Sequence, residues 1–322
     1  MTASRAGRPD LSTIVVTWRN AEVIARCLGS IRSAALEHPQ EIIVVDNASD
    51  DGTPDVAATA EPGARVVKLP GNFGFAAANN AGLSHARGRY AALVNSDCFP
   101  DPGALDALVD ALDESPAIGI VGGKLRYEDG RHQPSAGSLP TLRTELWLAL
   151  GLHRAPMTAR LGIGLLSAEA LYLRARRVGW VTGAFCAFRP EVGLLPGEGF
   201  MYGEDVEWAA QAHAKGFEVR LEPRATAMHL NAYSVSRSLP RGFREASRVD
   251  HALRWFASRG PLPLAAERAI LSLHALVRLV AAAALIPIRP RRGVANLRSS
   301  GALFRSALTR ARVSMPRPAR LP

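Results

Sequence analysis

Three polar side chains follow strand-like apolar runs of the sequence, where they could bind a nucleotide. Thr17 ends the run 12–17, Asp46 follows a second run, and Asp97 closes the sequence Asn95-Ser96-Asp97 after a third. An acid at the end of a buried strand can accept hydrogen bonds from a base or a ribose. A divalent cation on a diphosphate needs only one or two protein carboxylates. The alternative for each acid is an ordinary polar loop, in which it caps a turn or a helix.

A segment rich in glycine and asparagine, residues 71–82, could bring backbone close to an anionic ligand. Gly71 and Gly74 carry no side chain that would block the approach. The start of the helix expected from Ala76 favours anionic groups. The spacing is not the GxGxxG of dinucleotide-binding proteins. A tight turn before a close-packed helix of alanine and glycine is the alternative.

Glu204, Asp205 and His229 could take part in proton transfer or metal binding. The two adjacent acids open a predicted helix at 203–215, where the helix dipole stabilises negative charge. Their mutual repulsion would move their pKa values apart, although both would serve equally well as a helix cap. His229 follows a predicted strand and could bind a metal or a phosphate, or be an ordinary structural residue.

The segments between these residues predict an α/β fold with a mostly parallel sheet. Strand-like runs alternate with helical patterns, and several runs are continuously apolar, which is typical of strands covered by helices on both faces. Ligands of such sheets bind outside the carboxyl ends of the strands. The region 131–177 is expected to form loops and short helices over one side of the sheet. We expect strands at 12–17, 41–45, 65–69, 90–94, 118–121, 179–188, 217–221 and 225–228, and helices from about 20 to 31 and at 54–60, 76–86, 101–112 and 203–215.

Composition and charge exclude several classes of protein. The chain has 322 residues, 48% of them hydrophobic, which is too apolar for a mostly disordered protein. Its net charge of +10 is uneven, since residues 259–322 carry +11 and residues 1–258 carry −1. A nearly neutral body argues against nucleic-acid binding. Three cysteines without CxxC spacing and a start without an apolar segment favour a reducing, cytoplasmic compartment.

The order and spacing of several sequence blocks resemble the family 2 glycosyltransferases of GT-A fold, especially the rhamnosyltransferase-like members. The blocks read IVVTWRN, EIIVVDNASDDGT, PGNFGFAAANNAGLSHARGRYAALVNSD, GWVTGAFCAFR, GFMYGEDVEWAAQAHAKGF and HLNAYS. The resemblance runs from Ile14 to about Phe256. It implies a GT-A, Rossmann-like catalytic domain at 1–258, with a nucleotide-binding half at about 10–125 and an acceptor half at about 126–258.

The resemblance implies roles for residues of the nucleotide-binding half. Thr17 and Asp46 match positions that hold the base and ribose of the nucleotide. Asn72 and Asn80 match polar residues on the donor side. Asp97 matches the last acid of the family's DxD metal motif.

The acceptor half contains the residues that the resemblance assigns to chemistry. Asp205 matches the catalytic base of the family's ED motif, with Glu204 as its neighbour. His229 matches a histidine that can complete the metal site in some relatives. A strand lining the acceptor side is matched by Trp180, Gly183 and Ala184.

The implied activity is metal-dependent, inverting hexosyl transfer. Mg²⁺ or Mn²⁺ on Asp97, together with His229, would neutralise the charge developing on the leaving nucleotide diphosphate. Asp205 would take the proton of an acceptor hydroxyl as its oxygen attacks the anomeric carbon, so that a single displacement inverts the sugar. By resemblance dTDP-rhamnose is the first candidate donor, while the sequence leaves the sugar and the base (thymidine, uridine or guanosine) open. The acceptor is a saccharide or a polyprenol-linked saccharide of cell-surface polysaccharide or glycolipid synthesis.

Two departures from the family pattern bear on this activity. Asn95 replaces the first carboxylate of the metal motif, which would weaken metal binding. Residues 194–200 replace the usual Gly-Phe-Asp-Glu lead-in to the ED motif, so the acceptor loop is expected to differ. A non-catalytic protein that binds a sugar nucleotide on the same fold is the alternative that Asn95 favours.

Residues 259–322 are predicted to form a basic, helical C-terminal extension. Glu267, His274 and Arg278 share one face of the expected helix, and Arg278 in the middle of 269–288 makes a membrane-spanning segment costly. An amphipathic helix at a membrane surface is one alternative, and it would make the protein peripheral at the cytoplasmic face. At such a surface, anionic headgroups could meet Arg289, Arg291, Arg292 and Arg298. The other alternative is a helix packed on the catalytic domain, followed by a solvated tail.

Overall fold

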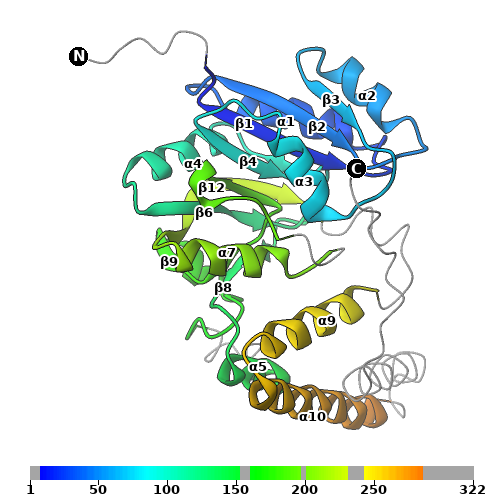
Figure 1. Cartoon of the computed structure of the whole chain (residues 1–322), viewed down its shortest axis with the longest axis vertical. Coiled ribbons are helices and arrows are strands. Elements are labelled where there is room, and N and C mark those ends of the chain that lie inside the picture. Colours follow the sequence, from blue (N-terminus) through cyan, green and yellow to red (C-terminus); the bar gives the residue numbers. More distant parts are fainter. Residues whose placement is uncertain (1–7, 153–159, 197–200, 231–242, 286–322) are drawn as a thin grey trace.

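A mixed sheet of ten strands lies at the centre of the computed structural model, which describes residues 8–152, 160–196, 201–230 and 243–285 (Figure 1). The strand order is β3 (Arg65–Lys68), β2 (Gln40–Asp46), β1 (Leu11–Thr17), β4 (Tyr90–Val94), β11 (Phe185–Phe188), β6 (Ile118–Arg126), β12 (Glu218–His229) and β5 (Cys98–Pro100). The first four of these strands are parallel to one another, as are β6 and β12, whereas β11 runs antiparallel to both of its neighbours. In addition, β7 (His132–Gln133) pairs with β6, and β9 (Arg176–Val178) pairs with β12.

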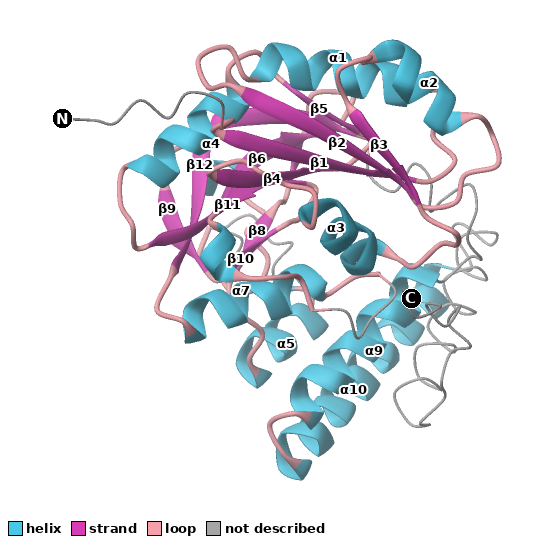
Figure 2. Ribbon diagram, turned by 45° about the horizontal axis from the view of Figure 1, so that its top comes forward, coloured by secondary structure: helices cyan, strands magenta, loops and turns pink. Residues whose placement is uncertain are grey.

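Helices cover both faces of this sheet, as the continuous apolar strands predict (Figure 2). α1 (Ile24–Ala34), α2 (Thr53–Ala60) and α4 (Ala104–Asp113) pack on one face. α3 (Phe75–Leu83) and α7 (Glu204–Ala214) pack on the other. Successive β2 residues alternate between the two cores, because side chains of a strand point to opposite faces. The predicted α/β class with a mostly parallel sheet is therefore confirmed.

The single strand predicted at 179–188 is wrong. β10 (Trp180–Val181) pairs with β8 (Ala136–Gly137) in a separate two-stranded sheet, and only β11 joins the main sheet. Residues 182–184, which connect β10 to β11, form hydrogen bonds on both sides. The Thr182 N–H donates to Ser135 O, next to β8, and Ala184 O accepts the N–H of Asn95, next to β4. The apolar run is continuous, so its sequence does not show where the chain changes sheets.

β12 is longer than predicted, since the strands expected at 217–221 and 225–228 form one element. The pairing of β12 with β6 shifts register between Glu222 and Thr226. Pro223 lies inside this irregularity, where a missing N–H costs no regular ladder bond. β12 also pairs antiparallel with β5, a short strand that the sequence did not predict.

A layer of three helices lies below the sheet in Figure 1. It consists of α5 (Leu142–Ala149), α9 (Phe243–Ala257) and α10 (Pro261–Leu285), and α10 packs against the other two. Trp255 and Phe256 of α9 pack with Val206 of α7, and the Trp255 indole N–H donates to Pro140 O. Among the described residues, no helix combines the length and hydropathy needed to cross a membrane.

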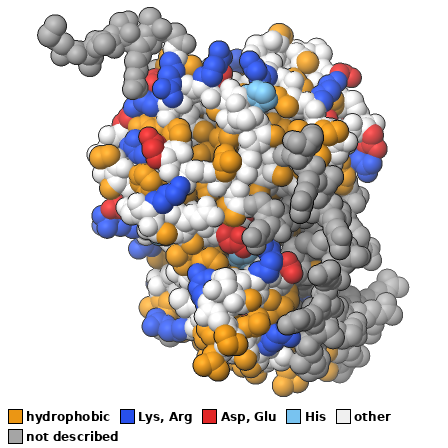
Figure 3. Space-filling model, viewed as in Figure 1, with side chains coloured by type: hydrophobic (Ala, Val, Ile, Leu, Met, Phe, Trp, Pro, Cys, Tyr) orange, Lys and Arg blue, Asp and Glu red, His pale blue; other side chains and the backbone are white. Residues whose placement is uncertain are grey.

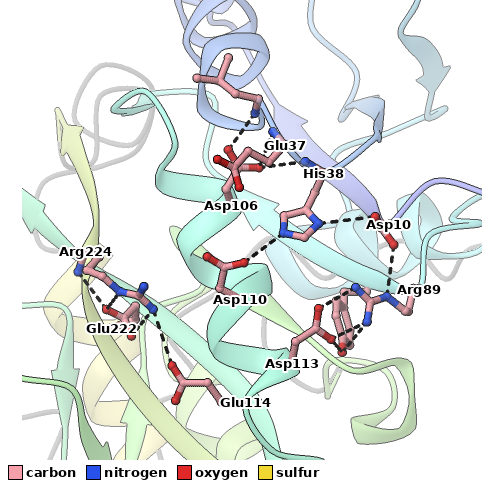
Figure 4. Close-up of polar contacts among 12 residues, drawn as sticks. Asp10, Glu37, His38, Arg89, Asp106, Asp110, Asp113, Glu114, Glu222 and Arg224 are labelled. Atoms are coloured by element: carbon pink, nitrogen blue, oxygen red, sulfur yellow. Dashed lines mark hydrogen bonds and ion pairs between the residues drawn. The ribbon is translucent and has the colours of Figure 1, made fainter.

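A polar network fixes α4 at the amino end of β1, opposite the end that carries Thr17 (Figure 4). The Asp106 carboxylate accepts the backbone N–H groups of three consecutive residues, 36–38. The His38 ring lies between Asp110, at 3.1 Å, and Asp10, at 3.5 Å. These contacts lie away from the carboxyl ends of the strands and hold the fold together.

Candidate active site

One elongated cavity of about 810 Å³ extends from the carboxyl ends of β1 and β4 to the helical layer. Its first part, which we call the donor end, is lined by side chains from the strand-end loops. Its second part, the acceptor end, is lined by the start of α7 and by α5, α9 and α10. The donor end includes Trp18, Asn47, Asn72, Asn95, Ser96, Asp97 and His229, and the acceptor end Trp180, Gly183, Ala184, Glu204, Asp205, Glu145, Arg248, His251, His274 and Arg278.

Asp97 and His229 meet at the donor end although 132 positions separate them in the sequence. The antiparallel pairing of β12 with β5 places His229 opposite Cys98, next to Asp97. His229 Nε2 lies 3.2 Å from Asp97 Oδ1, and both side chains are almost completely buried. His229 Nδ1 lies 2.8 Å from Gln133 Oε1.

This arrangement fits a divalent cation. Nδ1 faces the Gln133 side-chain amide, and Nε2 faces the Asp97 carboxylate. Nε2 is buried and makes no hydrogen bond among the described residues. Metal-binding histidines commonly donate their second N–H to a neighbouring acceptor. The described residues contain no cluster of three potential ligands, so further ligands would come from a diphosphate and water.

Two asparagines fix the loops of the donor end. Asn47 donates through Nδ2 to Asn72 Oδ1 at 2.9 Å and accepts the Phe73 N–H at 2.9 Å. Asn72 Oδ1 also accepts the Gly74 N–H at 3.0 Å. Gly74 has a φ of +81°, which a residue with a Cβ rarely adopts. The glycine and asparagine residues thus set a loop conformation at the cavity, and the sequence did not single out Asn47.

Asn80 lies outside the cavity lining. Its Nδ2 donates to Leu195 O at 2.8 Å, and its Oδ1 accepts the Leu195 N–H at 2.9 Å. Both ends of the amide therefore fasten the loop that precedes α7. Gly82, in the same helix, packs closely on the sheet, since a Cβ there would lie 2.6 Å from Ile14 Cγ2.

Thr17 and Asp46 are partners in the parallel register of β1 and β2. Thr17 Oγ1 and Asp46 Oδ1 are both buried without a hydrogen-bond partner in the described structure. Asp46 Oδ2 accepts the Ser49 N–H, and the residue lines a smaller cavity beside Lys68. Buried polar atoms without partners are rare in folded proteins, so these two atoms are an unusual feature of this strand end.

The acid pair lies at the start of α7, at the acceptor end. Burial, and then the charge of Asp205, raise the pKa of Glu204. Burial also raises the pKa of Asp205, whereas His251 and the backbone N–H groups of Val206 and Gly183 lower it. Asp205 is thus a carboxyl group whose pKa is raised overall, with an N–H from the predicted acceptor strand beside it.

His251 of α9 covers the start of α7. A Cβ at Gly203 would lie 2.1 Å from the His251 ring, so only glycine leaves room for it, and φ there is +107°. His251 Nδ1 bonds Glu207 Oε1 at 3.1 Å, and its Nε2 is buried without a partner among the described residues. The predicted acceptor residue Trp180 donates its indole N–H to Ser138 O at 3.1 Å.

Several cavity residues carry no recognisable signal in the sequence. Gln133 and Glu145 belong to no motif, and Arg248 and His251 lie on a helix that was not predicted. Only their long-range packing reveals them. Parts of two sequence motifs fall outside the described residues, namely 197–200 of the altered lead-in and the NAYS sequence at 231–234.

Comparison with known proteins identifies the family. The profile described as Glycosyl transferase family 2 matches residues 12–164. The N-acetylglucosaminyl-diphospho-decaprenol L-rhamnosyltransferase of Mycobacterium tuberculosis is 31% identical over 245 residues, which cover 70% of this chain and 78% of the relative. The chain belongs to glycosyltransferase family 2. This glycosyltransferase is also 29% identical to succinoglycan biosynthesis protein ExoO of Rhizobium meliloti, over 76% of this chain and 65% of the relative.

Solved structures show the fold. The mannosyltransferase of Pyrobaculum calidifontis, solved in complex with GDP-Man and Mn²⁺, superposes with a TM-score of 0.54 at 20% identity. The match covers 94% of this chain and 89% of that structure. The glycosyltransferase therefore has the GT-A fold, as the motifs predicted.

Proposed function

We propose that the chain is a metal-dependent, inverting glycosyltransferase that acts on a lipid-linked saccharide. The observation that carries the proposal is the single cavity that contains both the Asp97–His229 pair and the acid pair of α7. A nucleotide sugar in the donor end would present its anomeric carbon towards Asp205. Holding both substrates in one cavity removes much of the entropic barrier to their reaction.

Charge at the donor end supports the use of a divalent metal. Within the described lining, only Arg248 and Arg278 are Lys or Arg, and both belong to the helical layer. The charge of a leaving nucleotide diphosphate therefore has no arginine or lysine partner among the described donor-end residues. Mg²⁺ or Mn²⁺ held by Asp97 and His229 would supply that positive charge.

The acceptor end supports general-base catalysis by Asp205. The Gly183 N–H and the cationic form of His251 favour the ionised carboxylate, while burial keeps its pKa above the ordinary value. Such a group accepts a proton near neutral pH more effectively than an ordinary aspartate. The acceptor oxygen then attacks opposite the leaving diphosphate, and one displacement inverts the anomeric configuration.

The substrates follow from the relatives by analogy. The mycobacterial relative is named for L-rhamnosyl transfer to an N-acetylglucosaminyl-diphospho lipid. We propose dTDP-rhamnose as donor and a polyprenol-linked saccharide of cell-surface polysaccharide synthesis as acceptor.

Asn95 favours a second candidate, a non-catalytic protein that binds a sugar nucleotide. The amide replaces a carboxylate, and the described residues contain no group of three His, Cys, Asp or Glu side chains that could hold a metal. Asp205 in the same cavity counts against this candidate, because binding of a nucleotide alone needs no base at the acceptor end.

The C-terminal extension supports action at the cytoplasmic face of a membrane. The face of α10 that points away from the protein is apolar, with exposed fractions of 37–81% for its leucine and valine side chains. Figure 3 shows hydrophobic side chains gathered at this end of the molecule. The arginines predicted to meet headgroups, at 289–298, lie outside the described residues. The exposed residues of this face are Leu262, Leu273, Leu276, Val277 and Val280.

The polar face of α10 lies against the catalytic domain. Glu267 is fully buried, the His274 ring donates through Nδ1 to Ala149 O at 3.0 Å, and Arg278 lines the cavity. Thus α10 packs on the domain and still presents an apolar surface. We retain the division at 258 as a proposal, with the extension completing the acceptor end.

A panel of nucleotide sugars tests the proposed function. We expect dTDP-rhamnose to raise the melting temperature of the full chain in Mn²⁺ and to do so less in EDTA, since bound ligand stabilises by mass action. UDP- and GDP-sugars serve as comparisons for the base. The absence of a shift with every nucleotide sugar would contradict the proposal.

A further inference from the structure

The acceptor end of the cavity concentrates side chains that can carry positive charge. Arg248 and His251 come from α9, and His274 and Arg278 come from α10. The two helices pack against each other, and all four side chains line the cavity. The motifs of the family 2 resemblance assign no role to any of them.

The acids around this region are held towards their neutral forms or are already paired. Burial raises the pKa of Glu145, although Arg248 and His251 lower it. Burial, and then Glu145, raise the pKa of Glu267, which lies behind the lining. Glu207 already bonds His251 and lies 3.6 Å from Arg254. Apart from the acid pair of α7, the charged side chains in the described lining of this end are therefore two arginines and Glu145, an acid whose pKa is raised.

We propose that Arg248 and Arg278 form a subsite for the diphosphate of the lipid-linked acceptor. The inference rests on the proposed function, which places the acceptor sugar at Asp205 in the same cavity. Arginine binds phosphate oxygens with paired, charge-assisted hydrogen bonds. The lipid chain would then leave the cavity beside α10, whose outward face is apolar. One helix thus offers a cationic face to the diphosphate and an apolar face to the lipid.

Binding of geranyl diphosphate to the full chain in EDTA tests the subsite without requiring transfer. EDTA removes the metal that would attract a diphosphate to the donor end. We expect Arg278→Gln and Arg248→Gln each to weaken binding about 10- to 100-fold, as loss of a charged hydrogen bond does. Arg278→Lys should restore part of it. The matched control is Arg143→Gln, an exposed arginine of α5 outside the cavity. Equal affinities for wild type, control and variants would overturn the proposal.

Transfer kinetics distinguish this subsite from a lipid-headgroup site. With N-acetylglucosaminyl-diphospho-geraniol as acceptor, Arg278→Gln should raise KM by the same factor and change kcat less. With octyl N-acetylglucosaminide, an acceptor that contains no phosphate, wild type and variant should have the same KM. Binding to vesicles containing anionic lipid should be unchanged in the variant. An equal KM effect on both acceptors, or a loss confined to vesicle binding, would contradict the diphosphate assignment. Arginine-dependent diphosphate binding without any transfer would support the subsite and count against the proposed function.

Discussion

The two ends of the cavity are built in different ways. At the donor end, short loops follow consecutive strands, and nearby residues such as Asn47 and Asn72 bond to one another. At the acceptor end, the site depends on packing between segments far apart in the chain, such as His251 on Gly203. The residues that shape a strand-end loop are close together in the sequence and can be recognised there, whereas a site made by helix docking depends on residues far apart in the chain.

The two ends also differ in charge. The donor end combines amides with one acid and one histidine, so its affinity for a diphosphate should depend on a metal. The acceptor end contains Arg248 and Arg278, so its affinity for a diphosphate should not depend on a metal. Variants at each end should therefore respond differently to EDTA, acceptor and pH.

The largest effect is expected from Asp205→Asn. Loss of a general base lowers kcat by about 10²–10⁴-fold. Donor binding should be unchanged, because the donor end is separate. Glu191→Gln, which removes an exposed acid outside the cavity, is the control. Transfer by Asp205→Asn at the wild-type rate would show that the acceptor end needs no base there.

Asp97→Asn should have the next largest effect, confined to the donor end. The variant leaves His229 without its carboxylate partner, and we expect Mn²⁺-dependent donor affinity to fall about 10- to 100-fold. Thermal shifts with the donor, in Mn²⁺ and in EDTA, provide the measurement. Geranyl diphosphate binding in EDTA should be unaffected. If wild type and variant gain equally from Mn²⁺, the metal does not bind at Asp97.

Glu267→Gln should change stability at the acceptor end in a pH-dependent way. Burial and Glu145 raise the pKa of Glu267 from 4.5 to about 8. The contribution of the neutral acid is complete below pH 4.5 and is lost as pH rises towards 8, because only the unfolded chain ionises freely in that range. The variant should therefore melt a few degrees above wild type at pH 9 and level with it at pH 5. A constant difference at both pH values would contradict a buried neutral acid.

His38→Gln should have the smallest effect, on the stability of the half that carries the donor end. Burial lowers the pKa of His38, but its bonds to Asp110 and Asp10 raise it more, so the net shift is upward (Figure 4). Its contribution is present below the ordinary pKa of 6.5 and is lost as pH rises through the raised value. Partly exposed pairs of this kind contribute about 1 kcal/mol or less. The variant should be less stable than wild type at pH 6, nearly equal at pH 8.5, and equally active.

The sequence predicted the half that carries the donor end well because its signals are local. Continuous apolar runs and the polar residues that follow them mark β1, β2 and β4 together with Thr17, Asp46 and Asp97. The sheet change at 182–184 was missed, since an apolar run looks alike in one sheet or two. β5 was missed because a three-residue strand has no periodicity to detect.

The acceptor end could be predicted only in part. The Glu204-Asp205 sequence was recognisable as a family motif, and the spacing of Glu267, His274 and Arg278 correctly placed them on one helix face. Spacing alone does not tell whether that face meets water, lipid or protein. Arg248 and His251 had no pattern at all, because their position depends on the docking of α9 against α7.

The most direct test of the account is transfer by the wild-type protein from dTDP-rhamnose to an N-acetylglucosaminyl-diphospho lipid, with the anomeric configuration of the product determined by NMR. The account predicts a rhamnosylated lipid of inverted configuration, formed with Mn²⁺ or Mg²⁺ and abolished by EDTA. Absence of product with this and every other nucleotide sugar, or a product of retained configuration, would contradict it.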